Sequence, residues 1–232
     1  MDTVMRPTLA AEALRANLTQ YLTTTFGLTE DPVRAGLASF LIHPEQGIFR
    51  GPYLRIRTPF RPAADDWRDH LEWAPRDWTP WGHQAKAFAR LSTLNGPARP
   101  TLVTTGTGSG KTEAFLIPVL DHCRRARRAG RAGVKAILLY PMNALATDQT
   151  GRIDALLQDP DLADVTAGLY IGDVAAIEYE RVLTKRSEMR RTPPDILITN
   201  YKMLDLLLQR ADDLPLWADA DLGCVSRIRI VR

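Results

Sequence analysis

A run of eight residues combines three glycines, a lysine and small hydroxyl side chains, a composition suited to holding phosphate. An apolar stretch precedes the run and a helix-forming stretch follows it. Glycine lets consecutive backbone amides turn toward one anion, and the N-terminus of the following helix carries partial positive charge. The pattern therefore predicts a phosphate-binding loop between a strand and a helix. Its residues are Thr105, Gly106, Thr107, Gly108, Ser109, Gly110, Lys111 and Thr112.

Two side chains at the end of this loop carry the expected catalytic chemistry. The ammonium group of Lys111 can reach the β- and γ-phosphates of a nucleoside triphosphate, and the hydroxyl of Thr112 can bind Mg2+. The usual pattern begins with glycine, whereas this chain has Thr105 there, so the match is to a relaxed form. Small-molecule kinases, GTPases and transport ATPases share such a loop, so other residues must decide the class of protein.

Gln84 lies 27 residues before Lys111, at the end of the run Thr79–Gln84. A primary amide can donate to and accept from the N6/N7 edge of adenine at the same time. An isolated glutamine is usually a solvent-facing residue, but its place before a phosphate-binding loop favours an adenine contact. We therefore expect Gln84 to give a preference for ATP over GTP.

Two further segments place short polar side chains where an expected strand runs into an expected helix. The first is Leu138–Gln149 and the second is Pro194–Leu204. Between them, Tyr170–Asp173 places a Gly-Asp turn at the end of another expected strand. Helix N-termini suit phosphate groups, although an ordinary strand-to-helix corner or a helix cap would explain the same residues.

In this order and spacing, the segments between residues 79 and 205 resemble the motifs of superfamily 2 DEAD/DEAH-box helicases. The runs Tyr140–Ala146 and Thr199–Leu204, with the earlier Pro59–Pro62, are similar to large bacterial members that act in DNA repair and phage defence. The resemblance implies an ATP-dependent helicase that uses ATP and Mg2+ and binds nucleic acid, with DNA favoured over RNA. It also implies that the nucleic-acid backbone is contacted by Pro141, Asn143, Thr199 and Asn200.

The resemblance also implies an Asp-Glu pair, which holds Mg2+ and orients water, about thirty residues after the last of these segments. Leu222–Arg232 contains no acidic residue. Asp195 precedes its strand and should lie at the sheet edge away from the phosphates, which leaves Asp173 as the best remaining candidate. We expect negligible hydrolysis by this chain alone, which also lacks the second RecA-like lobe. We interpret residues 222–232 as an aberrant or truncated tail caused by a frameshift or a premature stop.

The elements around these residues predict an α/β fold, in which a mostly parallel sheet is flanked by helices. By resemblance this is an incomplete RecA-like P-loop NTPase domain over residues 79–221, preceded by an N-terminal accessory region over residues 1–78. Strands are expected at Thr101–Thr105, Lys135–Tyr140, Val165–Ile171 and Asp195–Thr199. Helices are expected at Lys111–Arg128, Asn143–Leu157, Val174–Arg190 and Tyr201–Gln209, after an amphipathic helix at Leu9–Leu22 that packs through Leu14, Leu18 and Leu22.

The composition is that of a soluble globular protein, with 45% hydrophobic and 25% charged residues. A net charge of +3 is compatible with a polyanionic partner without requiring one. Cys123 and Cys224 lack the spacing of a zinc site or a disulfide framework. Because no apolar run is long enough to cross a bilayer, we expect a cytoplasmic location and no membrane partner. The oligomeric state stays open.

Several conspicuous residues are expected to be structural. The arginine-rich end of the expected helix Lys111–Arg128 suggests DNA binding, but positive charge there also complements the helix dipole. The four histidines are scattered without the spacing of metal ligands. The tryptophans of the accessory region can stack on bases, but packing on the following domain is the stronger expectation. These are Trp67, Trp73, Trp78 and Trp81.

The sequence leaves three functions open. The leading one is the ATP-binding portion of an ATP-dependent helicase or translocase. A P-loop ATPase or kinase that acts on a small molecule is the alternative, and it is distinguished by whether single-stranded DNA alters nucleotide affinity. An inactive ATP- or DNA-binding module is the third, and salt-sensitive DNA binding without ATP hydrolysis would favour it.

Overall fold

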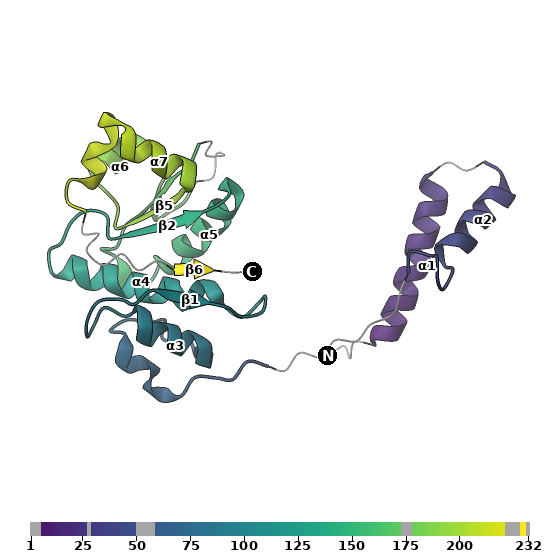
Figure 1. The fold of residues 1–232 in the computed structure, drawn as a ribbon, viewed down its shortest axis with the longest axis horizontal. Coiled ribbons are helices and arrows are strands. Elements are labelled where there is room, and N and C mark those ends of the chain that lie inside the picture. Colours follow the sequence, from purple (N-terminus) through teal and green to yellow (C-terminus); the bar gives the residue numbers. More distant parts are fainter. Residues whose placement is uncertain (1–5, 27–28, 50–58, 173–177, 221–227, 231–232) are drawn as a thin grey trace. The chain divides into compact units, whose positions relative to one another are not determined.

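The computed structural model describes residues 6–26, 29–49, 59–172, 178–220 and 228–230. The chain divides into two compact units, Met1–Pro59 and Phe60–Arg232, and each is described by itself (Figure 1). No helix among the described residues is both long and apolar enough to cross a bilayer. All the residues with expected nucleotide or nucleic-acid chemistry belong to the second unit.

The first unit contains the helices α1 (Pro7–Thr25) and α2 (Asp31–Leu41). Each has a proline in its first turn, where a fixed φ suits the start of a helix. The N-terminal helix is thus confirmed, and its expected packing through Leu14, Leu18 and Leu22 stays a prediction. Within this unit Leu14 is 58% exposed and Leu18 is 38% exposed, whereas Leu22 is partly buried.

Four parallel strands form the larger sheet described in the second unit. In order across the sheet they are β2 (Ala136–Tyr140), β5 (Ile196–Asn200), β3 (Ala167–Tyr170) and β4 (Val182–Leu183). Side chains alternate across a strand, so Ile196 and Ile198 pack into one hydrophobic core, whereas Leu197 packs into a second. Both faces of this sheet are therefore covered, as expected for parallel strands.

A second, two-stranded sheet carries the strand that precedes the glycine-rich loop. β1 (Thr101–Val103) pairs in parallel with β6 (Ile228–Ile230), and Thr101 lies opposite Ile228. The described part of the expected tail over residues 222–232 is therefore a strand beside β1. The other residues of that tail lie outside the described residues.

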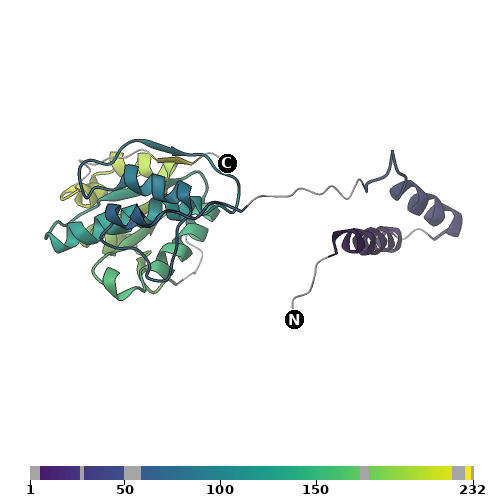
Figure 2. The same cartoon turned by 90° about the horizontal axis from the view of Figure 1, so that it is seen from below.

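Helices flank the strands on both sides. Figure 1 shows α6 and α7 on one side of β2 and β5, with α4 on the other side. In the view from below, α3 and the segment that precedes it lie in front of the sheet (Figure 2). The α-helices of this unit are α3 (Gly82–Leu91), α4 (Lys111–Arg128), α5 (Asn143–Leu156), α6 (Arg186–Arg191) and α7 (Tyr201–Gln209). The 3-10 helices are η1 (Asp65–His70), η2 (Pro160–Leu162) and η3 (Ala211–Trp217).

The predicted α/β fold with a mostly parallel sheet is confirmed, and α4 and α7 have the predicted bounds. The four predicted strands are present and differ by a few residues at their ends. Residues 174–177 of the helix predicted at Val174–Arg190 lie outside the described residues, and the prediction is wrong for the rest of that range, which is not one helix. Val182–Leu183 instead adds a strand beside β3, and a helix forms only in α6, where Met189 is buried. Pairing with a distant strand has overridden the local helical preference.

Residues 60–78 pack with the unit that contains the glycine-rich loop. Trp67 and Trp73 are each 4% exposed, and Trp78 packs against the same core. The rings of Trp67, Trp78 and Phe88 contact one another, with centroids separated by 5.9 to 6.1 Å. The expectation that these tryptophans pack on the domain is confirmed, while Trp81 is 36% exposed.

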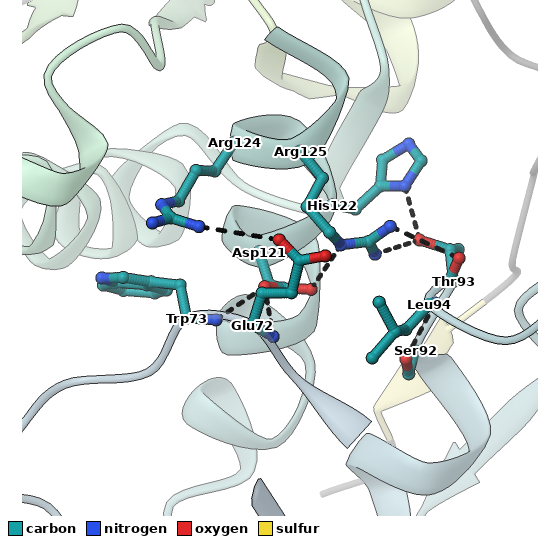
Figure 3. Close-up of polar contacts among 9 residues, drawn as sticks. All are labelled: Glu72, Trp73, Ser92, Thr93, Leu94, Asp121, His122, Arg124 and Arg125. Carbon is teal, nitrogen blue, oxygen red and sulfur yellow. Dashed lines mark hydrogen bonds and ion pairs between the residues drawn. The ribbon is translucent and has the colours of Figure 1, made fainter. Parts of the chain in front are cut away.

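Asp121, on α4, holds this N-terminal segment by its backbone (Figure 3). Its fully buried carboxylate accepts hydrogen bonds from the amide of Glu72 at 3.0 Å and that of Trp73 at 2.8 Å. Arg125, one turn along the same helix, donates its Nε to the carboxylate at 3.0 Å. The helix that follows the loop is therefore fixed to the segment that precedes α3.

Three arginines near the end of α4 have partners within the unit. Arg124 donates to the carbonyl of Asp161, and Arg125 donates to Thr93 as well as to Asp121. Arg127 donates to the carboxylate of Asp195. These three side chains are structural as expected, although buried tertiary contacts, rather than the helix dipole alone, hold them in place.

Candidate nucleotide and nucleic-acid sites

The glycine-rich loop connects β1 to α4 and contains two glycines in the left-handed region. Gly108 has φ 75° and Gly110 has φ 72°. Residues with a Cβ rarely adopt this conformation, which explains glycine at both positions. Gly110 is also the N-cap of α4, so the turn delivers the chain directly to the positive end of that helix.

The ammonium group of Lys111 lies inside the loop. Its Nζ donates to the backbone carbonyls of Thr105 and Gly106, at 2.8 Å in both cases. Neither carbonyl carries a formal charge, so a phosphate oxygen would compete well for the same protons. Thr105, at the position usually held by glycine, shares a hydrogen bond with the hydroxyl of Ser109 across the loop.

The hydroxyl of Thr112 stands at the first turn of α4 and donates to Gln149 Oε1 at 3.1 Å. This leaves the lone pairs of the hydroxyl oxygen for another partner. Mg2+ prefers oxygen ligands and keeps several waters while it binds substrate phosphates, so one protein hydroxyl fits this ion. No group of three His, Cys, Asp or Glu side chains that could hold a metal occurs among the described residues.

Gln84 contacts the loop directly. Its side chain is 2% exposed, its Oε1 accepts from the amide of Trp81 at 2.7 Å, and its Nε2 donates to the carbonyl of Gly110 at 2.8 Å. The neighbouring His83 shares a hydrogen bond with the carbonyl of Ser109 at 2.9 Å. These contacts use one lone pair and one N–H of the Gln84 amide. These two contacts with the loop join residues far apart in the sequence, and no sequence signal predicted them.

Asn143 and Asn200 meet at the carboxyl ends of two adjacent strands. Asn200 Nδ2 donates to Asn143 Oδ1 at 2.7 Å, and Asn200 Oδ1 accepts from the amide of Met203 at 2.8 Å. Asn200 thus caps α7 as predicted. Asn143 begins α5, and Pro141 in the preceding turn is exposed. The two helix N-termini and Pro141 therefore lie at the same edge of the sheet.

Thr199 does not belong to this exposed group. Its side chain is fully buried, and its Oγ1 donates to the carbonyl of Tyr170 at 2.6 Å on the neighbouring strand. The expectation that Thr199 touches phosphate is not met in this structure. Because side chains alternate along β5, the hydroxyl of Thr199 is turned toward the interior while Asn200 reaches the sheet edge.

Arg186 brings a positive charge to the carboxyl end of β3, a role that no sequence pattern indicated. Its Nη2 donates to the carbonyls of Ile171 at 3.1 Å and Gly172 at 3.2 Å. Its guanidinium carbon lies 5.0 Å from the centre of the Tyr170 ring. The position depends on the β4–α6 turn, which was misread as a helix. Asp173, the acidic candidate of this turn, lies outside the described residues.

With this geometry established, comparison with known proteins decides the family. Residues 81–222, more than half of the chain, match the family model of the DEAD/DEAH box helicases. The chain belongs to the DEAD/DEAH box helicase family. The resemblance of its motifs to superfamily 2 helicases is confirmed, and the family uses ATP, usually with Mg2+.

This DEAD/DEAH box helicase chain is similar to much longer curated proteins. It is 29% identical over 172 residues to the Druantia protein DruE of Escherichia coli (strain UMEA 4076-1), covering 66% of the chain and 9% of that protein. It is 31% identical over 125 residues to the probable ATP-dependent RNA helicase ddx27 of Dictyostelium discoideum, covering 54% of the chain and 14% of that protein. The chain therefore spans a small part of the relatives that it matches.

Two solved structures share the fold of this helicase chain. The DUF1998 helicase MrfA bound to DNA and AMPPNP gives a TM-score of 0.50 at 21% identity, covering 75% of this chain and 22% of that one. The DEAD-box helicase Mss116 bound to ssRNA and UDP-BeF gives a TM-score of 0.51 at 17% identity. This match covers 66% of this chain and 35% of the Mss116 chain. The predicted RecA-like architecture is thereby confirmed.

Proposed function

We propose that this chain is the ATP-binding portion of an ATP-dependent nucleic-acid helicase or translocase. The observation that carries the proposal is the loop between β1 and α4, where the ammonium group of Lys111 lies among glycine-rich backbone. In the proposed complex, Lys111 leaves the loop carbonyls and binds the β- and γ-phosphates, while the hydroxyl of Thr112 binds Mg2+. The remaining donor and acceptor of Gln84 read adenine.

Nucleic acid is proposed to lie along the edge formed by Pro141, Asn143 and Asn200. The N-termini of α5 and α7 direct backbone amides and partial positive charge to this edge, which suits a phosphate backbone. DNA is favoured over RNA, because the runs 140–146 and 199–204 are similar to those of bacterial helicases of DNA repair.

Hydrolysis by the 232-residue chain alone is proposed to be slow. β6 lies beside β1, the strand that leads into the loop, but the residues that follow β6 are Val231 and Arg232 rather than two carboxylates. Without such acids, the metal and the attacking water lose the groups that orient them. Binding of nucleotide, rather than turnover, is therefore the informative measurement.

The test is calorimetric binding of ATP and GTP to the full chain and to Lys111→Ala. Lys111→Ala should abolish detectable ATP binding, whereas Arg128→Ala should not, because Arg128 is an exposed cation on the same helix roughly 25 Å away. Gln84→Ala should reduce the preference for ATP over GTP. It should also lower the affinity for ATP, because the Gly110 carbonyl loses its hydrogen-bond donor. Equal ATP binding by the unmodified chain and Lys111→Ala would refute the site.

A second arm tests the nucleic-acid partner. The affinity for ATP is measured again with single-stranded DNA or RNA of the same sequence. DNA should change ATP affinity more than RNA does, and the binding of DNA should weaken as salt is raised. No change with either polymer would favour a P-loop protein that acts on a small molecule.

A further inference from the structure

One hydrogen bond joins the first turn of α4 to α5 beside the glycine-rich loop. Thr112 Oγ1 donates to Gln149 Oε1 at 3.1 Å. Gln149 is 7% exposed, and its Nε2 donates to Asp148 Oδ2 at 2.8 Å. A carboxylate can only accept, so the amide nitrogen must face Asp148 and the amide oxygen must face Thr112. The orientation of the Gln149 amide is therefore fixed.

That orientation controls where the hydroxyl of Thr112 can act. A hydroxyl has one proton and two lone pairs, and it binds a cation through a lone pair. Its proton must then point away from the cation and toward an acceptor. Gln149 Oε1 supplies that acceptor from a nearly buried position.

The neighbouring polar groups of α5 and α4 have other partners. Thr147 and Thr150 donate their hydroxyl protons to carbonyls of α5 itself, those of Asn143 and Ala146. Glu113, next to Thr112, is engaged through Oε1 by Arg152 at 3.4 Å, and its Oε2 is buried without a hydrogen-bond partner among the described residues. The contact with Thr112 is thus made by the amide of Gln149 and not by a general polar surface.

We infer that Gln149 is a positioning residue for Mg2+, which holds the hydroxyl of Thr112 in the orientation that binds the metal. The inference rests on the proposed function of the loop as a Mg2+–ATP site. Gln149 acts through Thr112 and need not touch the ion or the nucleotide. Loss of its acceptor should therefore change the dependence of ATP binding on Mg2+, and leave the metal-free contacts of the loop with phosphate intact.

The first test replaces Gln149 by methionine, which has a similar length but cannot accept this hydrogen bond. ATP binding to the full chain is measured in excess chelator and along a Mg2+ titration. Metal-free ATP affinity should stay within about twofold, while the Mg2+ concentration for half-maximal enhancement should rise about 10-fold, the usual effect of removing a partner of a metal ligand. Gln158→Met, at an exposed glutamine that pairs with Glu180, is the matched control and should change neither value.

The second test restores the hydrogen-bond acceptor by exchanging the two groups, so that the carboxylate is at residue 149 and the amide is at residue 148. In Asp148→Asn/Gln149→Glu, the new carboxylate can accept from Thr112 and from the amide of residue 148, without two adjacent negative charges. The requirement for Mg2+ should return close to that of the unmodified chain. If Gln149 only filled space, the double variant and Gln149→Met should show the same requirement for Mg2+, because glutamate and methionine fill similar space.

The outcomes separate this inference from the proposed function. Equal Mg2+ dependence in Gln149→Met and the unmodified chain overturns the inference alone, and so does a requirement still raised about 10-fold in the restored pair. Undiminished ATP binding by Lys111→Ala overturns the proposed site, and the inference with it. An additive effect of Gln149→Met in a Thr112→Val background also contradicts it, because the two side chains should act as one unit.

Discussion

Lys135 Nζ lies 2.6 Å from a carboxylate oxygen of Asp195, and both side chains are fully buried. Arg127 Nε also donates to Asp195 at 2.8 Å, and Thr166 donates to it through its amide and its hydroxyl. Asp195 precedes β5, whereas Asn200 ends that strand at the proposed nucleic-acid edge. Asp195 therefore stabilises the amino end of the sheet through these contacts, and its position before the strand predicted that it lies at this end.

Asp195→Asn should lower the free energy of unfolding by about 3–5 kcal/mol, because the ammonium group of Lys135 is left buried without its counter-charge. Denaturation with urea measures the loss. Asp212→Asn is the control, because Asp212 is 73% exposed and lies 3.8 Å from Arg210, so its removal should change stability by at most about 1 kcal/mol. Similar losses in the two variants would show that the buried pair is not stabilising the sheet.

Local signals predicted much of this fold, and contacts between distant residues account for the rest. α4 begins directly after a glycine turn and α7 begins at a capping asparagine, so their bounds could be predicted from the sequence. β4 is two residues long and exists through pairing with β3, which no local pattern reveals. The glycine-rich turn between β1 and α4 was also predicted from the sequence. The burial of Thr199 and the contact of Gln84 with Gly110 depend on how separate elements meet.

Tyr140 presents a hydroxyl that is buried without a hydrogen-bond partner in the described part of the chain. Burial raises its pKa to about 12, with Arg152 lowering the pKa and Asp148 raising it. An unfolded tyrosine has a pKa of about 10, so the folded state holds the phenolic proton more tightly. This contribution to stability is fully present below about pH 10 and is lost as the pH rises through 12.

Tyr140→Phe should therefore be neutral or stabilising by up to about 1 kcal/mol at pH 7, because no hydrogen bond is lost. Its advantage over the unmodified chain should grow as the pH rises above about 10. Unfolding by urea at neutral and alkaline pH measures both effects. Tyr201→Phe, at a residue 57% exposed, should show no such growth. A constant difference across this pH range would contradict the assignment.

Gly110 is the glycine of the loop with the tightest surroundings. Besides its left-handed φ of 72°, a Cβ there would overlap the amide nitrogen of Gln84. Gly110→Ala should lower stability by about 1–2 kcal/mol and weaken ATP binding, because both the turn and its contact with Gln84 must shift. Gly151→Ala is the control, since Gly151 lies within α5 with nothing near its Cβ position and should gain about 0.5–1 kcal/mol. If Gly110→Ala bound ATP as well as the unmodified chain does, the turn at Gly110 would not be part of the nucleotide site.

Asn143 and Thr199 should respond differently to substitution, although both were expected to contact nucleic acid. Asn143 is exposed and hydrogen-bonds Asn200, so Asn143→Ala should weaken binding of single-stranded DNA about 10-fold, as loss of one hydrogen bond to a charged group does. Thr199→Val keeps the shape of a buried side chain but leaves the Tyr170 carbonyl without its donor, so it should cost about 1 kcal/mol of stability and leave DNA affinity unchanged.

Fluorescence anisotropy of a labelled oligonucleotide at one fixed salt concentration measures the affinity, and urea denaturation measures the stability. Asn95→Ala, at an exposed asparagine in the turn after α3, should affect neither quantity. Weaker DNA binding by Thr199→Val at full stability would mean that β5 turns its hydroxyl outward when nucleic acid binds. Unchanged DNA affinity in Asn143→Ala would instead move the nucleic-acid contact away from the N-terminus of α5.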